Sequence, residues 1–85
     1  MTEATYPYPT CMVTSQAQER IRQLGTAIQA QRIAQNLSQD KLAKMIGTDQ
    51  AVIARIEAGK QNTGIVHYIA IADALGVPLH DLIQF

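Results

Sequence analysis

Residues 37–60, LSQDKLAKMIGTDQAVIARIEAGK, hold two short segments with apolar stripes and a glycine between them. Ser38 is an N-cap candidate for the first segment, because its hydroxyl can accept a hydrogen bond from a backbone N–H of the first helical turn. Gly47 can end that helix in the left-handed conformation, and Asp49 can cap a second helix that runs to about Ala58. The stretch therefore predicts two short helices joined by a tight turn.

Helical periodicity extends on both sides of this stretch. Upstream, it predicts a helix that opens at Ser15, with Gln18 completing a capping box, and that stops near Asn36. Downstream, it predicts a helix over about residues 65–75 and, from Pro78 on, a last short helix. The side chains expected to face inward are Ile21, Leu24 and Ile28 in the first helix, Leu42, Ala43 and Ile46 in the second, Ile53 and Ile56 in the third, Ile65, Tyr68, Ile69, Ala72 and Leu75 in the fourth, and Leu79, Leu82 and Ile83 in the fifth. No alternating pattern typical of a strand occurs, so the predicted fold class is all-α with five helices.

The length and composition favour one small domain. The chain has 85 residues, a single cysteine at Cys11, and 47% hydrophobic residues. We expect the domain to span residues 15–85 and to follow an irregular, flexible tail over residues 1–14. No apolar run approaches the roughly 20 residues of a membrane span, and no secretory signal pattern opens the chain. We therefore expect a cytoplasmic protein without a membrane-bound segment.

The net charge of zero conceals an uneven distribution. All seven Lys and Arg lie within residues 20–60, together with only three acids, which gives that segment a net charge of +4. A basic middle segment is compatible with a polyanionic partner such as nucleic acid. Surface Lys and Arg are also ordinary in helical proteins, so the charge alone leaves both interpretations open.

The two predicted central helices and their turn resemble the lambda-repressor/Cro-like helix-turn-helix family, also called the XRE family. The likeness continues through ADALGVPLHDL at residues 72–82, which is similar to the last two helices of the family, and upstream through Leu24, Gly25 and Ile28. It covers roughly residues 20–84. The resemblance implies a five-helix lambda-repressor-like domain that binds double-stranded DNA.

The resemblance also implies a set of DNA-binding residues. They are Gln39, Gln50, Ala51, Ala54, Arg55, Lys60, Asn62 and Thr63. In the family, the residue matching Gln39 contacts a phosphate and braces the recognition helix, and the one matching Gln50 reads an adenine, whose N6 and N7 a Gln amide can bond together. Arg55 can bond a guanine or a phosphate, and the alanines can touch thymine methyl groups. Lys60, Asn62 and Thr63 lie in the loop after the third helix, which in the family contacts the DNA backbone.

Each of these residues has a simpler interpretation. The glutamines can be ordinary exposed helix residues, Arg55 a solvated charge, and Lys60 a partner of helix-end carbonyls. The resemblance further implies a buried ion pair between Arg32 and Glu57 that joins the first and third helices, with two unrelated surface charges as the alternative. Ala51, Ala54 and Ala58 on the recognition face offer few hydrogen bonds, so specificity can also rest on DNA shape.

We therefore interpret the chain as a small transcriptional regulator, a repressor that binds inverted-repeat operator DNA as a homodimer. The dimer contact is expected to involve the C-terminal apolar residues Leu79, Leu82, Ile83 and Phe85, and the alternative is that these residues only close the core of the monomer. The alternative is an antitoxin, which would bind a toxin protein and repress its own operon with the same module. No catalytic constellation is apparent, and His67 and His80 have no second ligand at a usable spacing. We expect neither an enzyme nor a bound metal or other cofactor.

Overall fold

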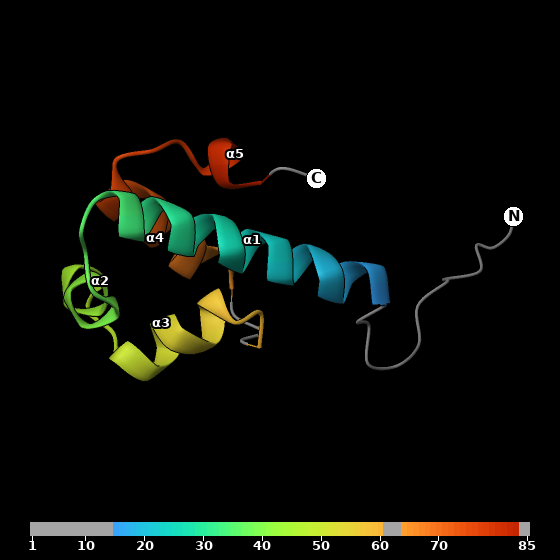
Figure 1. The fold of residues 1–85 in the computed structure, drawn as a ribbon, viewed down its shortest axis with the longest axis horizontal. Coiled ribbons are helices and arrows are strands. Elements are labelled where there is room, and N and C mark those ends of the chain that lie inside the picture. The colour runs from blue at the N-terminus through green and yellow to red at the C-terminus, as the bar shows by residue number, and fades with distance from the viewer. Residues whose placement is uncertain (1–14, 61–63, 84–85) are drawn as a thin grey trace, which may run out of the picture.

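The computed structural model describes residues 15–60 and 64–83, which form five helices (Figure 1). The helices are α1 (Ser15–Ala34), α2 (Gln39–Ile46), α3 (Gln50–Glu57), α4 (Ile65–Leu75) and α5 (Leu79–Leu82). No strand occurs in these two ranges, and the predicted all-α fold with five helices is confirmed. The predicted tail over residues 1–14 lies outside the described residues, as do Asn62 and Thr63.

The ends of the first helices follow from the residues that flank them. The Ser38 hydroxyl accepts a hydrogen bond from the Lys41 backbone N–H at 3.0 Å, which satisfies one of the unpaired donors at the start of α2. Gly47 ends α2 with a φ of 79°, a left-handed conformation that glycine adopts at little cost. Asn36 follows α1 with a φ of 60°. Asp49 occupies the N-cap position of α3, but its side chain makes no cap hydrogen bond.

The core lies where α1 and α4 pack against the other helices. In Figure 1, α1 runs along the length of the molecule, and it contacts α3, α4 and α5, while α2 contacts α3 and α4. The largest completely buried side chains are Ile28, Leu42, Ile53, Ile56, Ile71 and Leu82. Each such side chain contributes about 1.5–3 kcal/mol through removal of apolar surface from water. Tyr68 is buried with them, and this desolvation raises the pKa of its phenol above the usual 10.0.

Two of the residues predicted to face inward from α4 are exposed. Ile65 is 58% exposed and Ile69 is 45% exposed, whereas Ile71 is completely buried. The buried positions of α4 are 68, 71, 72 and 75, which form one helix face. Nearly every position of α4 is apolar, so periodicity could not distinguish this face from its neighbour. Ile83, also predicted to face inward, is 38% exposed, because it follows the last turn of α5 in an extended conformation.

Gly25 allows α1 to approach α3 closely. A Cβ atom placed on Gly25 would lie 2.3 Å from the Ile56 carbonyl oxygen and 2.7 Å from the Glu57 carbonyl oxygen. Any side chain at this position would therefore push α1 away from the C-terminal end of α3. At the same end of α3, the Gln18 amide donates a hydrogen bond to the Gly59 carbonyl at 3.3 Å. The placement of α3 against α1 thus depends on a glycine in a helix interior.

Replacing Gly25 with Ala tests this close approach. In an open helix interior the change would stabilise the protein by about 1 kcal/mol through helix propensity. Here the added methyl group meets backbone atoms, so we expect a loss of about 1–3 kcal/mol, the usual cost of overpacking. Urea unfolding followed by circular dichroism measures the change, with Thr26→Ala on the exposed face of α1 as the control. A more stable Gly25→Ala variant would show that α1 and α3 are not in close contact.

Candidate nucleic-acid interface

One face of α3 is open to solvent, and most of the predicted base-reading residues lie on it. Ile53 and Ile56 face the core on the other side of the helix. The residues on the outer face are Gln50, Ala51 and Arg55, which are exposed, and Ala54, which is half-buried. Their spacing of i, i+1, i+4 and i+5 keeps them on one side of the helix. In Figure 1, α3 lies at the lower edge of the molecule.

Arg32 and Glu57 form a buried ion pair behind this face. The Arg32 Nε donates to Glu57 Oε2 at 2.7 Å, and the Arg32 Nη2 donates to Glu57 Oε1 at 3.1 Å. The two side chains are only 11% and 2% exposed. The Arg32 Nη1 also donates to the Leu37 carbonyl at 2.6 Å. Such paired, charge-assisted hydrogen bonds offset much of the cost of burying two charges. The pair joins α1 to α3 and to the segment that leads into α2.

Two glutamines extend this ion pair to the surface. The Gln39 Nε2 donates to Glu57 Oε1 at 3.0 Å, and the Gln50 Nε2 donates to Gln39 Oε1 at 2.6 Å. Gln39 is half-buried at the start of α2, and Gln50 is exposed at the start of α3. The sequence predicted Gln39 and Gln50 as DNA-binding residues and, separately, Arg32 and Glu57 as an ion pair. No signal in the sequence indicated that Glu57, 18 positions from Gln39, would contact its side chain.

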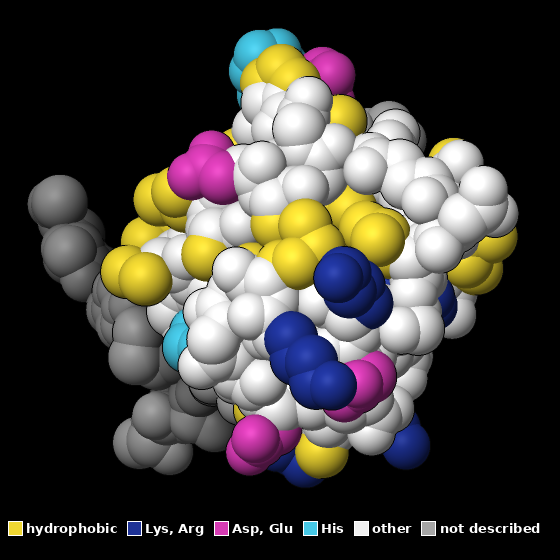
Figure 2. Space-filling view, turned by 90° about the vertical axis from the view of Figure 1, so that its left-hand side faces the viewer, with side chains coloured by type: hydrophobic (Ala, Val, Ile, Leu, Met, Phe, Trp, Pro, Cys, Tyr) yellow, Lys and Arg dark blue, Asp and Glu magenta, His cyan; other side chains and the backbone are white. Residues whose placement is uncertain are grey.

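Exposed basic side chains lie on α2 and just after the end of α3. Lys41 and Lys60 are exposed, and Lys44 is paired with Asp40 at 3.1 Å in an exposed contact. Figure 2 shows the end of the molecule that α2 occupies, where Lys and Arg side chains lie beside acidic ones. Exposed ion pairs of this kind contribute at most about 1 kcal/mol. They can therefore exchange an acidic partner for a phosphate at little cost.

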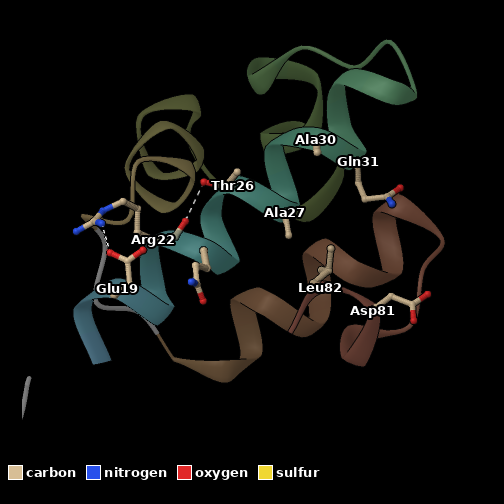
Figure 3. Close-up of a pocket in the computed structure, with 9 residues that line it drawn as sticks. Glu19, Arg22, Thr26, Ala27, Ala30, Gln31, Asp81 and Leu82 are labelled. Atoms are coloured by element: carbon tan, nitrogen blue, oxygen red, sulfur yellow. Dashed lines mark hydrogen bonds and ion pairs between the residues drawn. The ribbon is translucent and has the colours of Figure 1, made fainter. Parts of the chain in front are cut away.

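A separate cavity of about 500 Å³ lies between α1 and α5 (Figure 3). Its lining includes Ala27, Ala30 and Leu82, with the ion pair of Glu19 and Arg22 toward one end and Gln31 and Asp81 toward the other. None of the predicted DNA-binding residues lines it. The cavity and the outer face of α3 are therefore distinct features of the surface.

The two histidines do not form a metal site in the described part of the chain. His67 lies on α4 and His80 on α5, where His80 is 3.4 Å from the Asp81 carboxylate. Across residues 15–60 and 64–83, no group of three or more His, Cys, Asp or Glu side chains could hold a metal ion. None of the described helices combines the length and the apolar character needed to cross a membrane.

The fold and the exposed α3 face define a helix-turn-helix DNA-binding domain. A family model described as helix-turn-helix matches residues 28–82, well over half of the chain. The chain belongs to this helix-turn-helix family and is of the lambda-repressor/Cro-like type, which serves DNA binding and transcription regulation.

Two solved structures are similar to the chain. The restriction-modification controller protein C.AhdI from Aeromonas hydrophila has a TM-score of 0.70 and 29% sequence identity, over 73% of this chain and 94% of that chain. The hypothetical transcription factor NHTF from Neisseria has a TM-score of 0.72 and 25% identity, over 79% of this chain and 78% of that chain. A search of curated proteins gives no match.

A double-mutant cycle measures how strongly Arg32 and Glu57 interact. Replacing either residue alone with Ala leaves the other charge buried and unpaired, so we expect each single change to cost about 3–5 kcal/mol. The double variant should cost less than the sum of the two single losses. Urea unfolding of all four proteins gives the coupling free energy. Additive losses below about 1 kcal/mol would mean that the two charges act independently.

Proposed function

We propose that the protein is a repressor that binds inverted-repeat operator DNA as a homodimer, with α3 of each copy in the major groove. The observation that carries the proposal is the exposed face of α3, where Gln50 is held by Gln39 and, through it, by the buried Glu57. The likeness to a restriction-modification controller protein and to a hypothetical transcription factor supports a regulatory role. A protein that occupies a promoter blocks transcription by occupancy alone, which favours repression over activation.

The residues on this face suit base recognition in the major groove. The Gln50 amide can bond N6 and N7 of an adenine, and Arg55 can bond O6 and N7 of a guanine or a phosphate. Ala51 and Ala54 are small enough to let the helix approach the bases and to touch thymine methyl groups. Lys60 follows α3 and is exposed, so it is suited to a backbone phosphate. Asn62 and Thr63 stay predictions, because they lie outside the described residues.

A dimer is proposed because one recognition helix reads too few base pairs for useful specificity. A two-fold dimer of this class holds its recognition helices about 34 Å apart, which is one turn of DNA, and so requires an inverted-repeat site. Such symmetry uses the same surface of both copies. The dimer contact must therefore lie away from the outer face of α3.

The predicted C-terminal contact needs revision. Leu82 is completely buried in the core and Leu79 is half-buried, so neither is free to contact a second copy. Phe85 lies outside the described residues. The exposed large apolar side chains after α3 are Ile83, which follows α5, and three residues of α4, namely Ile65, Val66 and Ile69. We propose that the three α4 residues, called the α4 apolar face below, form the dimer contact.

A second candidate function follows from the same surface. An exposed apolar face can also bind a different protein, as in an antitoxin that binds a toxin and regulates its own operon. Before Asp73, α4 holds no Asp, Glu, Lys or Arg, which favours an apolar contact of either kind. Self-association in solution distinguishes the two, because the antitoxin alternative predicts that the α4 apolar face stays uncovered until the partner binds.

Substitutions at Gln50 and Lys60 should affect DNA binding in different ways. Gln50→Ala should lose about 1–3 kcal/mol on the best site and relax the preference at one base position. Lys60→Ala should weaken binding to all sequences similarly and lower the salt slope by about one unit. Selection from random duplexes, followed by fluorescence anisotropy, measures both effects, with Gln29→Ala on an exposed position of α1 as the control. If Gln50→Ala kept the wild-type base preference, α3 would not be the helix that contacts the bases.

Sedimentation of the purified protein tests the dimer. We expect the intact chain to be a dimer at tens of micromolar, and Val66→Lys with Ile69→Lys to give a folded monomer, because burying two ammonium groups in the contact is costly. Ile33→Lys is the matched control, since Ile33 is also exposed but lies on α1. A monomeric intact protein, or a double variant that stays dimeric, would refute the α4 apolar face as the contact.

A further inference from the structure

Arg22 of α1 lies beside the chain that leaves the C-terminal end of α3. A Cβ atom placed on the buried Gly59 would lie 2.8 Å from the Arg22 Cα and 3.3 Å from the Arg22 Cγ, so the two segments touch. One turn earlier on α1, the Gln18 amide donates to the Gly59 carbonyl at 3.3 Å. The next residue, Lys60, is exposed. Arg22 therefore contacts the residue that directly precedes Lys60, at the same end of α3.

The Arg22 guanidinium is accessible and is paired with an exposed group. Its side chain is 56% exposed, and it forms an ion pair with Glu19, which is 53% exposed and lies three residues earlier on α1. Figure 3 shows this pair at one end of the cavity between α1 and α5, with the guanidinium pointing away from Leu82. Exposed ion pairs contribute little to stability, because water solvates both charges when they separate. A stronger anionic partner can therefore replace Glu19.

We propose that Arg22 binds a backbone phosphate of the DNA, next to the phosphate bound by Lys60, and that Glu19 competes with the DNA for it. This inference rests on the proposed function, since it assumes that α3 enters the major groove and that the chain after α3 meets the DNA backbone. A guanidinium can donate two parallel hydrogen bonds to a phosphate. Neutralising a DNA phosphate also releases condensed counterions, a gain that the Glu19 carboxylate does not offer. Arg22 lies before residue 28, where the match to the helix-turn-helix family begins, so that match assigns it no role.

The two members of this ion pair should affect DNA binding with opposite signs. Binding of a phosphate by Arg22 breaks its pair with Glu19 and leaves the Glu19 carboxylate close to the DNA backbone, where like charges repel. Loss of the Arg22 charge should therefore weaken binding, whereas loss of the Glu19 charge should strengthen it. An ion pair with a purely structural role predicts the same direction of change for both substitutions.

Arg22→Gln removes the charge but keeps the Cβ and Cγ atoms that lie beside Gly59. Fluorescence anisotropy over a series of salt concentrations measures binding to the best duplex and to a scrambled one. We expect both duplexes to be bound roughly 3- to 10-fold more weakly at 0.1 M salt, with a salt slope smaller by about 0.9 for each half-site. Arg22→Lys should keep most of the wild-type slope, because an ammonium group also binds phosphate.

Arg20→Gln is the matched control for the loss of one positive charge. Arg20 is also exposed, and two positions along α1 place it on the opposite side of the helix, so this variant should keep the wild-type salt slope. Circular dichroism verifies that each variant is folded. Equal slopes for Arg22→Gln and the wild-type protein would overturn the inference.

Glu19→Gln tests the competition for Arg22. It should strengthen binding by about 1.5- to 5-fold, the factor that corresponds to an exposed ion pair. This gain should disappear when Arg22→Gln is also present, because Glu19 then has no guanidinium to withhold from the DNA. Asp81→Asn is the control for the loss of an exposed acid at the other end of the same cavity. If the gain persisted in the double variant, Glu19 would act by general repulsion, and the proposed competition would be wrong.

Neutral methylphosphonate linkages, placed one at a time across each half-site, locate the contact on the DNA. One linkage should weaken binding by the wild-type protein but have no effect on Arg22→Gln, and a neighbouring linkage should lose its effect in Lys60→Ala. If every linkage affected Arg22→Gln as it affects the wild-type protein, Arg22 would not bind a phosphate. Sequence-specific binding that survives both Gln50→Ala and Lys60→Ala would refute the proposed function, whereas a response to these two changes but not to Arg22→Gln would refute the inference alone.

Discussion

The buried Glu57 carboxylate is the group on which the arrangement of the first three helices depends. Taking a carboxylate out of water costs on the order of several kcal/mol unless its oxygens are fully hydrogen-bonded. Here α1 supplies two donors through Arg32 and α2 supplies a third through Gln39. Moving any one of these helices would leave part of the charge unpaired. The network therefore contributes more to the relative placement of α1, α2 and α3 than to net stability.

The steric constraint at Gly25 acts at the same helix crossing. Gly25, Ile28 and Arg32 lie on one face of α1, at the spacing of successive turns. Gly25 lets the α1 backbone come close to the last carbonyls of α3, Ile28 fills the core beside it, and Arg32 reaches Glu57. Close approach and charge pairing support each other, because a wider gap between the helices would break the short hydrogen bonds of the ion pair.

The sequence predicted features that depend on a single helix better than features that depend on packing between helices. Ser38 and Gly47 act through hydrogen bonds and φ angles within their own helix, so the sequence alone was enough to predict the bounds of α2. The buried face of α4 could not be predicted, because its apolar residues surround the helix and only the neighbouring helices decide that Ile71 rather than Ile69 is covered. The contact between Glu57 and Gln39 was also beyond prediction, since amide orientation depends on the packed structure.

The outer face of α3 carries few hydrogen-bonding groups, which makes the orientation of each one important. A free glutamine loses up to about 1.5–2 kcal/mol of side-chain entropy when it is fixed in one rotamer. In the structure, Gln50 is already held by Gln39 before any ligand is present, so much of this cost is met during folding. In the proposed dimer, two such contacts would act on two half-sites. The free-energy costs of mismatches at separate positions are roughly additive. The ratio of affinities by which one copy prefers adenine would therefore be squared for the dimer on the whole site.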